Sequence, residues 1–187
     1  MHHDIHSPLH RRTGYSLPEL LVVLAISAVL MQQSALAFDS MRRAVQLGEA
    51  RDAVQASLHL ARREGVRRSG RVVMCRLVGG ECSKNGNWGE GWTVFHDANR
   101  NLRHDGDEQL LFRQEAMPAR VQITSSKTVQ RFVAYGMHGP TLANNAFQAG
   151  SFYVCVPGEG EVAIQVISMG LSGFFHVTHS KAPSCPS

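Results

Sequence analysis

The sequence lacks the short motifs that mark the common catalytic and phosphate-binding sites. It has no Gly-x-Ser-x-Gly turn for a serine nucleophile, because Gly-Leu-Ser-Gly at residues 170–173 misses the spacing. It has no His-Glu-x-x-His pair and no phosphate-cradling glycine loop. Cys-x-x-Cys pairs of the redox or zinc kind are also missing. We therefore expect neither an enzyme nor a bound cofactor.

Cysteine is scarce, but its number is even. The four residues are Cys75, Cys82, Cys155 and Cys185. Such a set favours two disulfides formed in an oxidising compartment, with free thiols as the alternative. Three pairings are compatible with the sequence. We rank first Cys75–Cys82, across a Gly-Gly turn, together with Cys155–Cys185, which closes a loop long enough for about 2–4 kcal/mol of stabilisation.

Charge is missing from residues 20–38, which number nineteen. At about 1.5 Å per residue, a helix of this length approaches the roughly 30 Å thickness of a bilayer core. Arg11 and Arg12 precede the apolar run and favour a cytoplasmic N-terminus, so the rest of the chain would be exported. Glu19 stands at the edge of this run. A carboxylate there is unexpected, because a charged side chain within a membrane segment is energetically costly.

The next segment, from residue 39 to about residue 68, has no proline and is rich in helix-forming residues. Its small and apolar residues recur with helical spacing, which predicts an amphipathic helix that packs on a domain. Together with the apolar run it would form one helix of roughly fifty residues. The stripe consists of Leu47, Val54, Leu58, Ala61 and Gly65.

After Gly70, short β-branched and aromatic runs alternate with turn residues. One long helix followed by antiparallel strands predicts an α+β fold. No internal repeat or low-complexity linker interrupts this part of the chain. The candidate strands are residues 71–77, 92–96, 109–113, 120–124, 130–135, 151–156, 161–167 and 174–178.

The segment from Gly14 to Glu19, Gly-Tyr-Ser-Leu-Pro-Glu, resembles the processing motif of type IV prepilins and of type II secretion pseudopilins. The resemblance implies that a prepilin peptidase cleaves between Gly14 and Tyr15 and methylates the new amine of Tyr15. It also implies that Glu19 meets the α-amine of a neighbouring subunit in the assembled fibre. Two alternatives stay open: a secretory signal cleaved after Ala37, and a plain signal anchor.

Further blocks resemble the GspH/FimT family of minor pilins: residues 60–75, 87–101, 133–140 and 150–156. The resemblance implies a pilin-type helix packed on an antiparallel sheet. It also implies a subunit in the inner membrane, with its C-terminal domain in the periplasm, that assembles with other pilins near the tip of a pilus or pseudopilus. The expected segments are a leader (1–14), a membrane and assembly helix (15–38), an amphipathic helix (39–70) and a β-rich domain (71–187).

DNA is the alternative partner, because FimT proteins of natural transformation carry a Gly-Arg-x-Arg element in the last strand. Here residues 172–177 lack those arginines, and Lys181, His176 and His179 are weak substitutes. A basic cluster on the helix could bind DNA or an acidic partner, but we favour a solvated helix face and final turn. The cluster consists of Arg62, Arg63, Arg67, Arg68 and Arg71, and Lys181 near the C-terminus is a further candidate for DNA binding.

Residues 97–108 place oxygen-bearing side chains in the register of a calcium loop. The sixth position, which needs glycine, is Leu102, and two arginines add positive charge. A polar turn between strands is therefore the favoured interpretation. His176 and His179 could offer two nitrogens to a metal, but no third ligand is evident. The calcium candidates are Asp97, Asn99, Asn101, Asp105 and Glu108.

Overall fold

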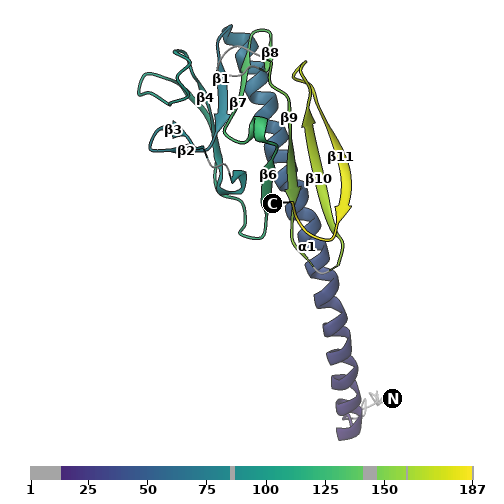
Figure 1. Cartoon of the computed structure of the whole chain (residues 1–187). Coiled ribbons are helices and arrows are strands. Elements are labelled where there is room, and N and C mark those ends of the chain that lie inside the picture. Colours follow the sequence, from purple (N-terminus) through teal and green to yellow (C-terminus); the bar gives the residue numbers. More distant parts are fainter. Residues whose placement is uncertain (1–13, 85–86, 141–146, 159, 187) are drawn as a thin grey trace, which may run out of the picture. The chain divides into compact units, whose positions relative to one another are not determined.

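The computed structural model describes residues 14–84, 87–140, 147–158 and 160–186, and only the backbone of residues 32–37 (Figure 1). The chain divides into two compact units, Met1–Met41 and Arg42–Ser187. Most of the expected leader, residues 1–13, lies outside the described residues. Helix α1 (Leu17–Arg68) begins in the first unit and ends in the second.

The first unit contains the start of α1, whose 52 residues confirm the predicted helix of about fifty. Ser16 precedes the first turn, and its carbonyl accepts a hydrogen bond from the Leu20 amide at 3.2 Å. The Ser16 amide in turn donates to Oε2 of Glu19 at 3.4 Å. This is half of a capping box, in which a side chain three residues into the helix satisfies an otherwise unpaired backbone amide. Pro18 fits because first-turn amides have no partner within the helix.

The expected membrane helix is not confirmed by this unit. Within residues 14–84, 87–140, 147–158 and 160–186, no helix has an apolar stretch long enough to cross a bilayer. The assignment of residues 20–38 to the membrane stays a prediction.

In the second unit, α1 buries the predicted stripe. Leu47, Val54, Leu58 and Ala61 are all at most 7% exposed, and Gly65 is also buried. The prediction of an amphipathic helix packed on a domain is therefore confirmed. The helix ends where Ser69 adopts a left-handed conformation with φ of 48°.

Eleven strands follow among the described residues, and all the pairings are antiparallel. A five-stranded sheet has the order β5 (Leu110–Gln114), β4 (Trp92–His96), β1 (Val72–Cys75), β7 (Val133–Gly136) and β8 (Gly139–Pro140). A four-stranded sheet has the order β11 (Phe175–Ala182), β10 (Val162–Met169), β9 (Gly150–Cys155) and β6 (Gln122–Ser125). The remaining elements are the hairpin β2 (Leu77–Val78) and β3 (Glu81–Cys82), with short helices η1 (Trp88–Glu90) and η2 (Lys127–Val129).

The α+β class is confirmed, and the strand at residues 92–96 has the predicted bounds. The single strand expected at residues 71–77 is wrong in its extent, because β1 ends at Cys75 and β2 leaves the sheet to pair with β3. Strands β3 and β8 were not expected. Each has only two residues, which is too short for an alternating pattern to be visible in the sequence.

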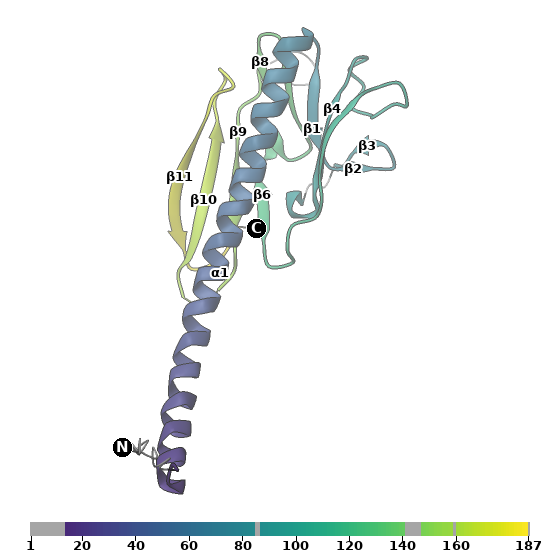
Figure 2. The ribbon, with the colours of Figure 1, turned by 180° about the vertical axis from the view of Figure 1, so that it is seen from behind.

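Both sheets share one core with the part of α1 in this unit. Figures 1 and 2, seen from opposite sides, place β9, β10 and β11 on one side of the helix and β1 and β4 on the other. Trp92 of β4 is buried between these elements, and its indole N–H donates to Ser57 Oγ of the helix at 2.8 Å. The core includes Val54, Leu58, Met74, Trp88, Trp92, Tyr135, Phe152, Val154, Ile167 and Met169.

Two disulfides fasten the outer parts of this unit. Cys75 at the end of β1 is bonded to Cys82 of β3, with Cα atoms 5.6 Å apart. Cys155 of β9 is bonded to Cys185 near the C-terminus, with Cα atoms 5.7 Å apart. This is the pairing ranked first from the sequence. The first bond holds the β2–β3 hairpin against the outer face of the five-stranded sheet, where Val73, Phe95 and Leu102 form a second core.

Candidate functional site

The helix of the first unit exposes apolar side chains around its whole circumference. Leu20, Leu21, Val22 and Val23 are consecutive and each is at least 54% exposed. Because successive residues of a helix are about 100° apart, four in a row place apolar side chains on every side of the helix. The same exposure continues at Leu24, Ile26, Val29, Leu30 and Met31. Water is a poor environment for such a surface, so it requires an apolar partner.

The candidate basic cluster is divided among separate partners. Glu64 accepts hydrogen bonds from Arg67 Nη2 at 2.6 Å and from Arg68 Nε at 3.0 Å. Arg68 also donates to the Gln109 side chain at 2.7 Å. Arg62 lies over the ring of Phe174, with its guanidinium carbon 3.8 Å from the ring centre. These contacts occupy charges that a phosphate-binding patch would need.

Two residues of the expected cluster lie elsewhere. Arg71 is only 4% exposed, so it is not part of a basic surface. Lys181 lies six residues beyond Phe175 in β11, about 20 Å further along the strand. Arg71 was a candidate because it follows the helix arginines in sequence, and Lys181 because it lies near the strand that lacks the Gly-Arg-x-Arg element. The fold instead buries one and separates the other, which leaves Arg63 as an exposed arginine of this set beside Arg67.

The hydrogen bonds to Glu64 predict that its contribution to the stability of the fold decreases at acidic pH. Hydrogen bonds from Arg67 and Arg68 lower the pKa of Glu64 from 4.5 to about 2. Because the pKa is lower in the folded state, the stabilisation is present above about pH 4.5 and is lost as the pH falls toward 2. We expect the difference in Tm between wild type and Glu64→Gln to shrink over that range.

The measurement is thermal unfolding of the full chain in detergent at a series of pH values. Glu49→Gln, at an exposed position of the same helix, controls for the loss of a carboxylate. A difference between wild type and Glu64→Gln that stays constant between pH 6 and pH 2 would contradict the prediction.

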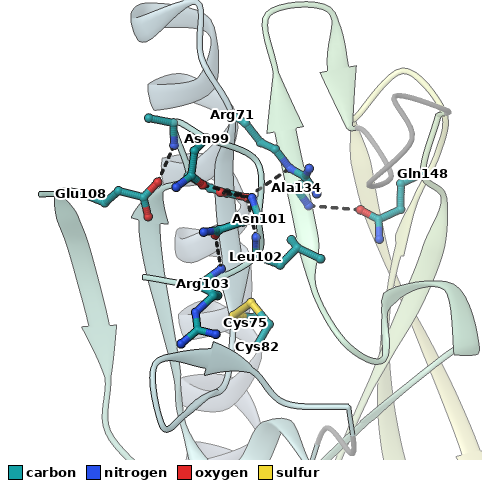
Figure 3. Close-up of polar contacts among 12 residues, drawn as sticks. Arg71, Cys75, Cys82, Asn99, Asn101, Leu102, Arg103, Glu108, Ala134 and Gln148 are labelled. Carbon is teal, nitrogen blue, oxygen red and sulfur yellow. Dashed lines mark hydrogen bonds and ion pairs between the residues drawn. A yellow bond between two sulfur atoms is a disulfide. The ribbon is translucent and has the colours of Figure 1, made fainter. Parts of the chain in front are cut away.

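The loop in the calcium register is closed by hydrogen bonds from the protein itself (Figure 3). Asp97, completely buried, accepts the backbone amides of Asn101 at 3.0 Å and Leu102 at 3.3 Å. Asp105 accepts the side-chain amides of Asn99 and Asn101, each at 2.8 Å. Both hydrogen bonds lower the pKa of Asp105. The oxygens that a cation would need are thus engaged by N–H groups.

Two further features of this loop fit a structural turn. Glu108 accepts the Ala98 amide at 2.7 Å, which joins the two ends of the loop. Leu102 has a left-handed φ of 61°, as the glycine of a calcium loop would, but its side chain is buried in the second core. Within the described part of the chain, no group of three or more His, Cys, Asp or Glu side chains could hold a metal ion.

A feature that the sequence analysis did not single out lies beside this loop. Nε of Arg71 is 3.6 Å from Oδ2 of Asp97, and both side chains are at most 4% exposed. Burial lowers the pKa of Arg71 and raises that of Asp97, and in both cases it outweighs the attraction between the two. The sequence does not predict this pair, because its two members are 26 positions apart and no local pattern connects the start of β1 with the loop after β4.

A family model described as type II transport protein GspH matches residues 50–170, more than half of the chain. The chain belongs to this family. The matched region runs from the buried part of α1 to the end of β10, so it covers the shared core of both sheets. GspH-family proteins are type IV pilin-like minor pilins and pseudopilins, and the resemblance found in the sequence is confirmed.

A solved structure agrees with the fold of this GspH-family protein. The type IV minor pilin FimU of Pseudomonas aeruginosa, in a P21 crystal, matches with a TM-score of 0.52 and 18% identity, covering 75% of this chain and 95% of that one. A P65 crystal of the same pilin gives 0.48 and 16%, with 74% and 99% covered. The first match supports the α+β fold of a helix packed on antiparallel sheets. A search of curated proteins returned no match.

Proposed function

We propose that this protein is a minor pilin or pseudopilin subunit that assembles through the apolar part of α1 into a type IV pilus or type II secretion pseudopilus. The observation that carries the proposal is the exposure of apolar side chains around the whole helix of the first unit, with Glu19 in its first turn. Burying each leucine or valine of that surface would contribute about 1.5–3 kcal/mol. Helices of other subunits in a fibre provide such a partner.

The proposal includes processing before assembly. Prepilin peptidase cleaves between Gly14 and Tyr15 and methylates the Tyr15 amine, and residues 20–38 hold the precursor in the inner membrane. Gly14 and Tyr15 are accessible in this arrangement: Tyr15 is 80% exposed, and α1 begins only at Leu17. The second unit then lies in the periplasm before assembly and at or near the fibre tip afterwards.

The alternatives have less support. DNA binding is disfavoured because four of the candidate arginines contact Glu64, Phe174 or Asp97. Cleavage after Ala37 would cut α1 within its length. The released domain would lack the exposed apolar side chains of the first unit, and these would then have no function in the mature protein. No catalytic constellation emerged from the sequence, and the family is one of structural pilins, so an enzymatic role is not proposed.

Mass spectrometry of the N-terminus of the protein purified from its native host tests the processing step. We expect a mature chain that begins with Tyr15 and carries one methyl group. A matched Gly14→Leu variant should keep the leader and run as the larger precursor. A wild-type chain that begins at Phe38 or retains residues 1–14 would contradict the proposal.

A further inference from the structure

A cavity of about 420 Å³ lies in the second unit where α1 ends. Three chain segments far apart in sequence line it: Ser69 to Arg71 after the helix, Arg100 of the polar loop, and Gly136 to His138 at the turn between β7 and β8. Phe147 completes the lining. The volume falls within the range of about 300–1,000 Å³ that is typical of sites for small ligands.

Arg71 borders this cavity with a guanidinium that has no hydrogen-bond partner in the described residues. Its three nitrogens, Nε, Nη1 and Nη2, are all buried and unsatisfied. Asp97 is 3.6 Å from Nε, too far for a hydrogen bond, and its two oxygens already accept backbone amides. Figure 3 shows Arg71 between the polar loop and β7. A buried charged group whose N–H donors have no hydrogen-bond acceptor is costly even beside an opposite charge, so this donor set is unusual in a structural role.

The surroundings of Arg71 favour a negative ligand. Burial lowers the pKa of its guanidinium, Asp97 opposes this shift, and the positive charge of Arg100 adds to it. An arginine stays protonated despite such shifts, so Arg71 and Arg100 bring two positive charges to a region in which Asp97 is the neighbouring carboxylate. His138 at the turn adds a further nitrogen-bearing side chain. An anion in the cavity would relieve the repulsion between Arg71 and Arg100.

The remaining lining indicates what the anion is attached to. Met137 and Phe147 are 52% and 59% exposed, which is high for large apolar side chains. A guanidinium is planar and binds a planar carboxylate through two parallel hydrogen bonds. Apolar groups beside it would contact the body that carries that carboxylate.

We propose that this cavity binds a carboxylate carried on an apolar or peptide body, with Arg71 as its bidentate ligand. The carboxylate could be supplied by a free organic acid or by an acidic side chain of a partner polypeptide. This site is independent of the helix assembly proposed above, because it lies wholly in the second unit and involves no residue of the first.

Thermal unfolding of the full chain in detergent, with benzoate and its neutral analogue benzamide as probes, tests the site. A ligand that binds only the folded state raises Tm as its concentration increases. We expect benzoate to raise the Tm of wild type and benzamide to have no effect. Arg71→Gln should weaken benzoate binding by about tenfold or more, since it removes a charge-assisted pair. Arg113→Gln, in the outer strand β5, is the matched control and should bind as wild type does.

A second pair of variants keeps the test decisive if Arg71→Gln does not fold. Met137 is exposed, so Met137→Glu and Met137→Gln should both fold. Only Met137→Glu places a negative charge at the cavity, and it should abolish the benzoate response. Equal responses to benzoate and benzamide, or equal benzoate responses in both Met137 variants, would overturn the proposal. A response to inorganic phosphate without any response to benzoate would overturn the assignment to a carboxylate.

The source of the carboxylate is addressed with capped peptides. A peptide with one glutamate among apolar residues is compared with the same peptide carrying glutamine. If the glutamate peptide binds more tightly than benzoate and the glutamine peptide does not bind, the site serves a polypeptide partner. If benzoate binds more tightly, it serves a free organic acid. Both results support the carboxylate site.

Discussion

Replacing Glu19 with glutamine is expected to prevent the protein from entering the fibre while the precursor still accumulates in the membrane. After cleavage, the Tyr15 amine would be buried among apolar helices, and Glu19 of a neighbouring subunit would be its counter-charge. Removing one partner of a buried ion pair costs about 3–5 kcal/mol, since the other charge is left uncompensated. A loss of that size corresponds to at least about a hundredfold less incorporation.

Glutamine is the informative substitution because of the local structure at the helix start. The Glu19 side chain accepts the Ser16 amide, and the carbonyl of glutamine can accept the same hydrogen bond. The helix start is thus preserved and only the charge is lost. The measurement compares the protein in sheared fibres with that in the membrane fraction by immunoblotting. Glu49→Gln, in the same helix but in the second unit, should assemble normally. Normal amounts of Glu19→Gln in fibres would contradict the pairing.

Replacing Gly65 with alanine is expected to lower the free energy of unfolding by about 1–2 kcal/mol, although alanine is the better helix former. A Cβ at Gly65 would lie 2.9 Å from the carbonyl oxygen of Tyr135 and 3.1 Å from its carbonyl carbon. These are backbone atoms of β7, which lies between β1 and β8 in the five-stranded sheet. They cannot move aside as a flexible side chain would, so the helix must shift away from the sheet.

Gly48 offers a matched control within the same helix. A Cβ there would meet no atom within 4 Å, so Gly48→Ala should raise the free energy of unfolding by up to about 1 kcal/mol. Denaturant unfolding of the full chain in detergent gives the free energy of unfolding of both variants. It thereby compares the same substitution beside the Tyr135 backbone and at a position without a neighbouring atom. If both variants were stabilised equally, the close approach of α1 to β7 would not limit packing at Gly65.

Local patterns in the sequence predicted those features that depend on a single helix or strand. The spacing of Leu47, Val54, Leu58 and Ala61 predicted the buried face of α1, because helical periodicity depends on neighbours within two turns. The run at residues 92–96 predicted β4 with its observed bounds. The break at Arg76 was not predicted, because the sequence does not show that Leu77 pairs with Cys82 outside the main sheet.

Assignments that depend on distant partners were weaker. The basic cluster was defined from charge alone, and the fold divided it, since Arg62 meets Phe174 and Arg68 meets Gln109. The calcium register describes only the order of oxygen-bearing side chains along the loop. It could not show that Asp97 and Asp105 already accept protein N–H groups.

The sequence by itself determined the family resemblance, the α+β class, the extent of the long helix and its buried stripe. These properties follow from motifs and periodicities that are complete within a short segment. Only the tertiary structure decided which charges remain exposed and which are buried. Burial of Arg71 beside Asp97 arises because the end of α1, the loop after β4 and the turn after β7 meet in space. The energy of a charge depends on that surrounding volume, which no local pattern describes.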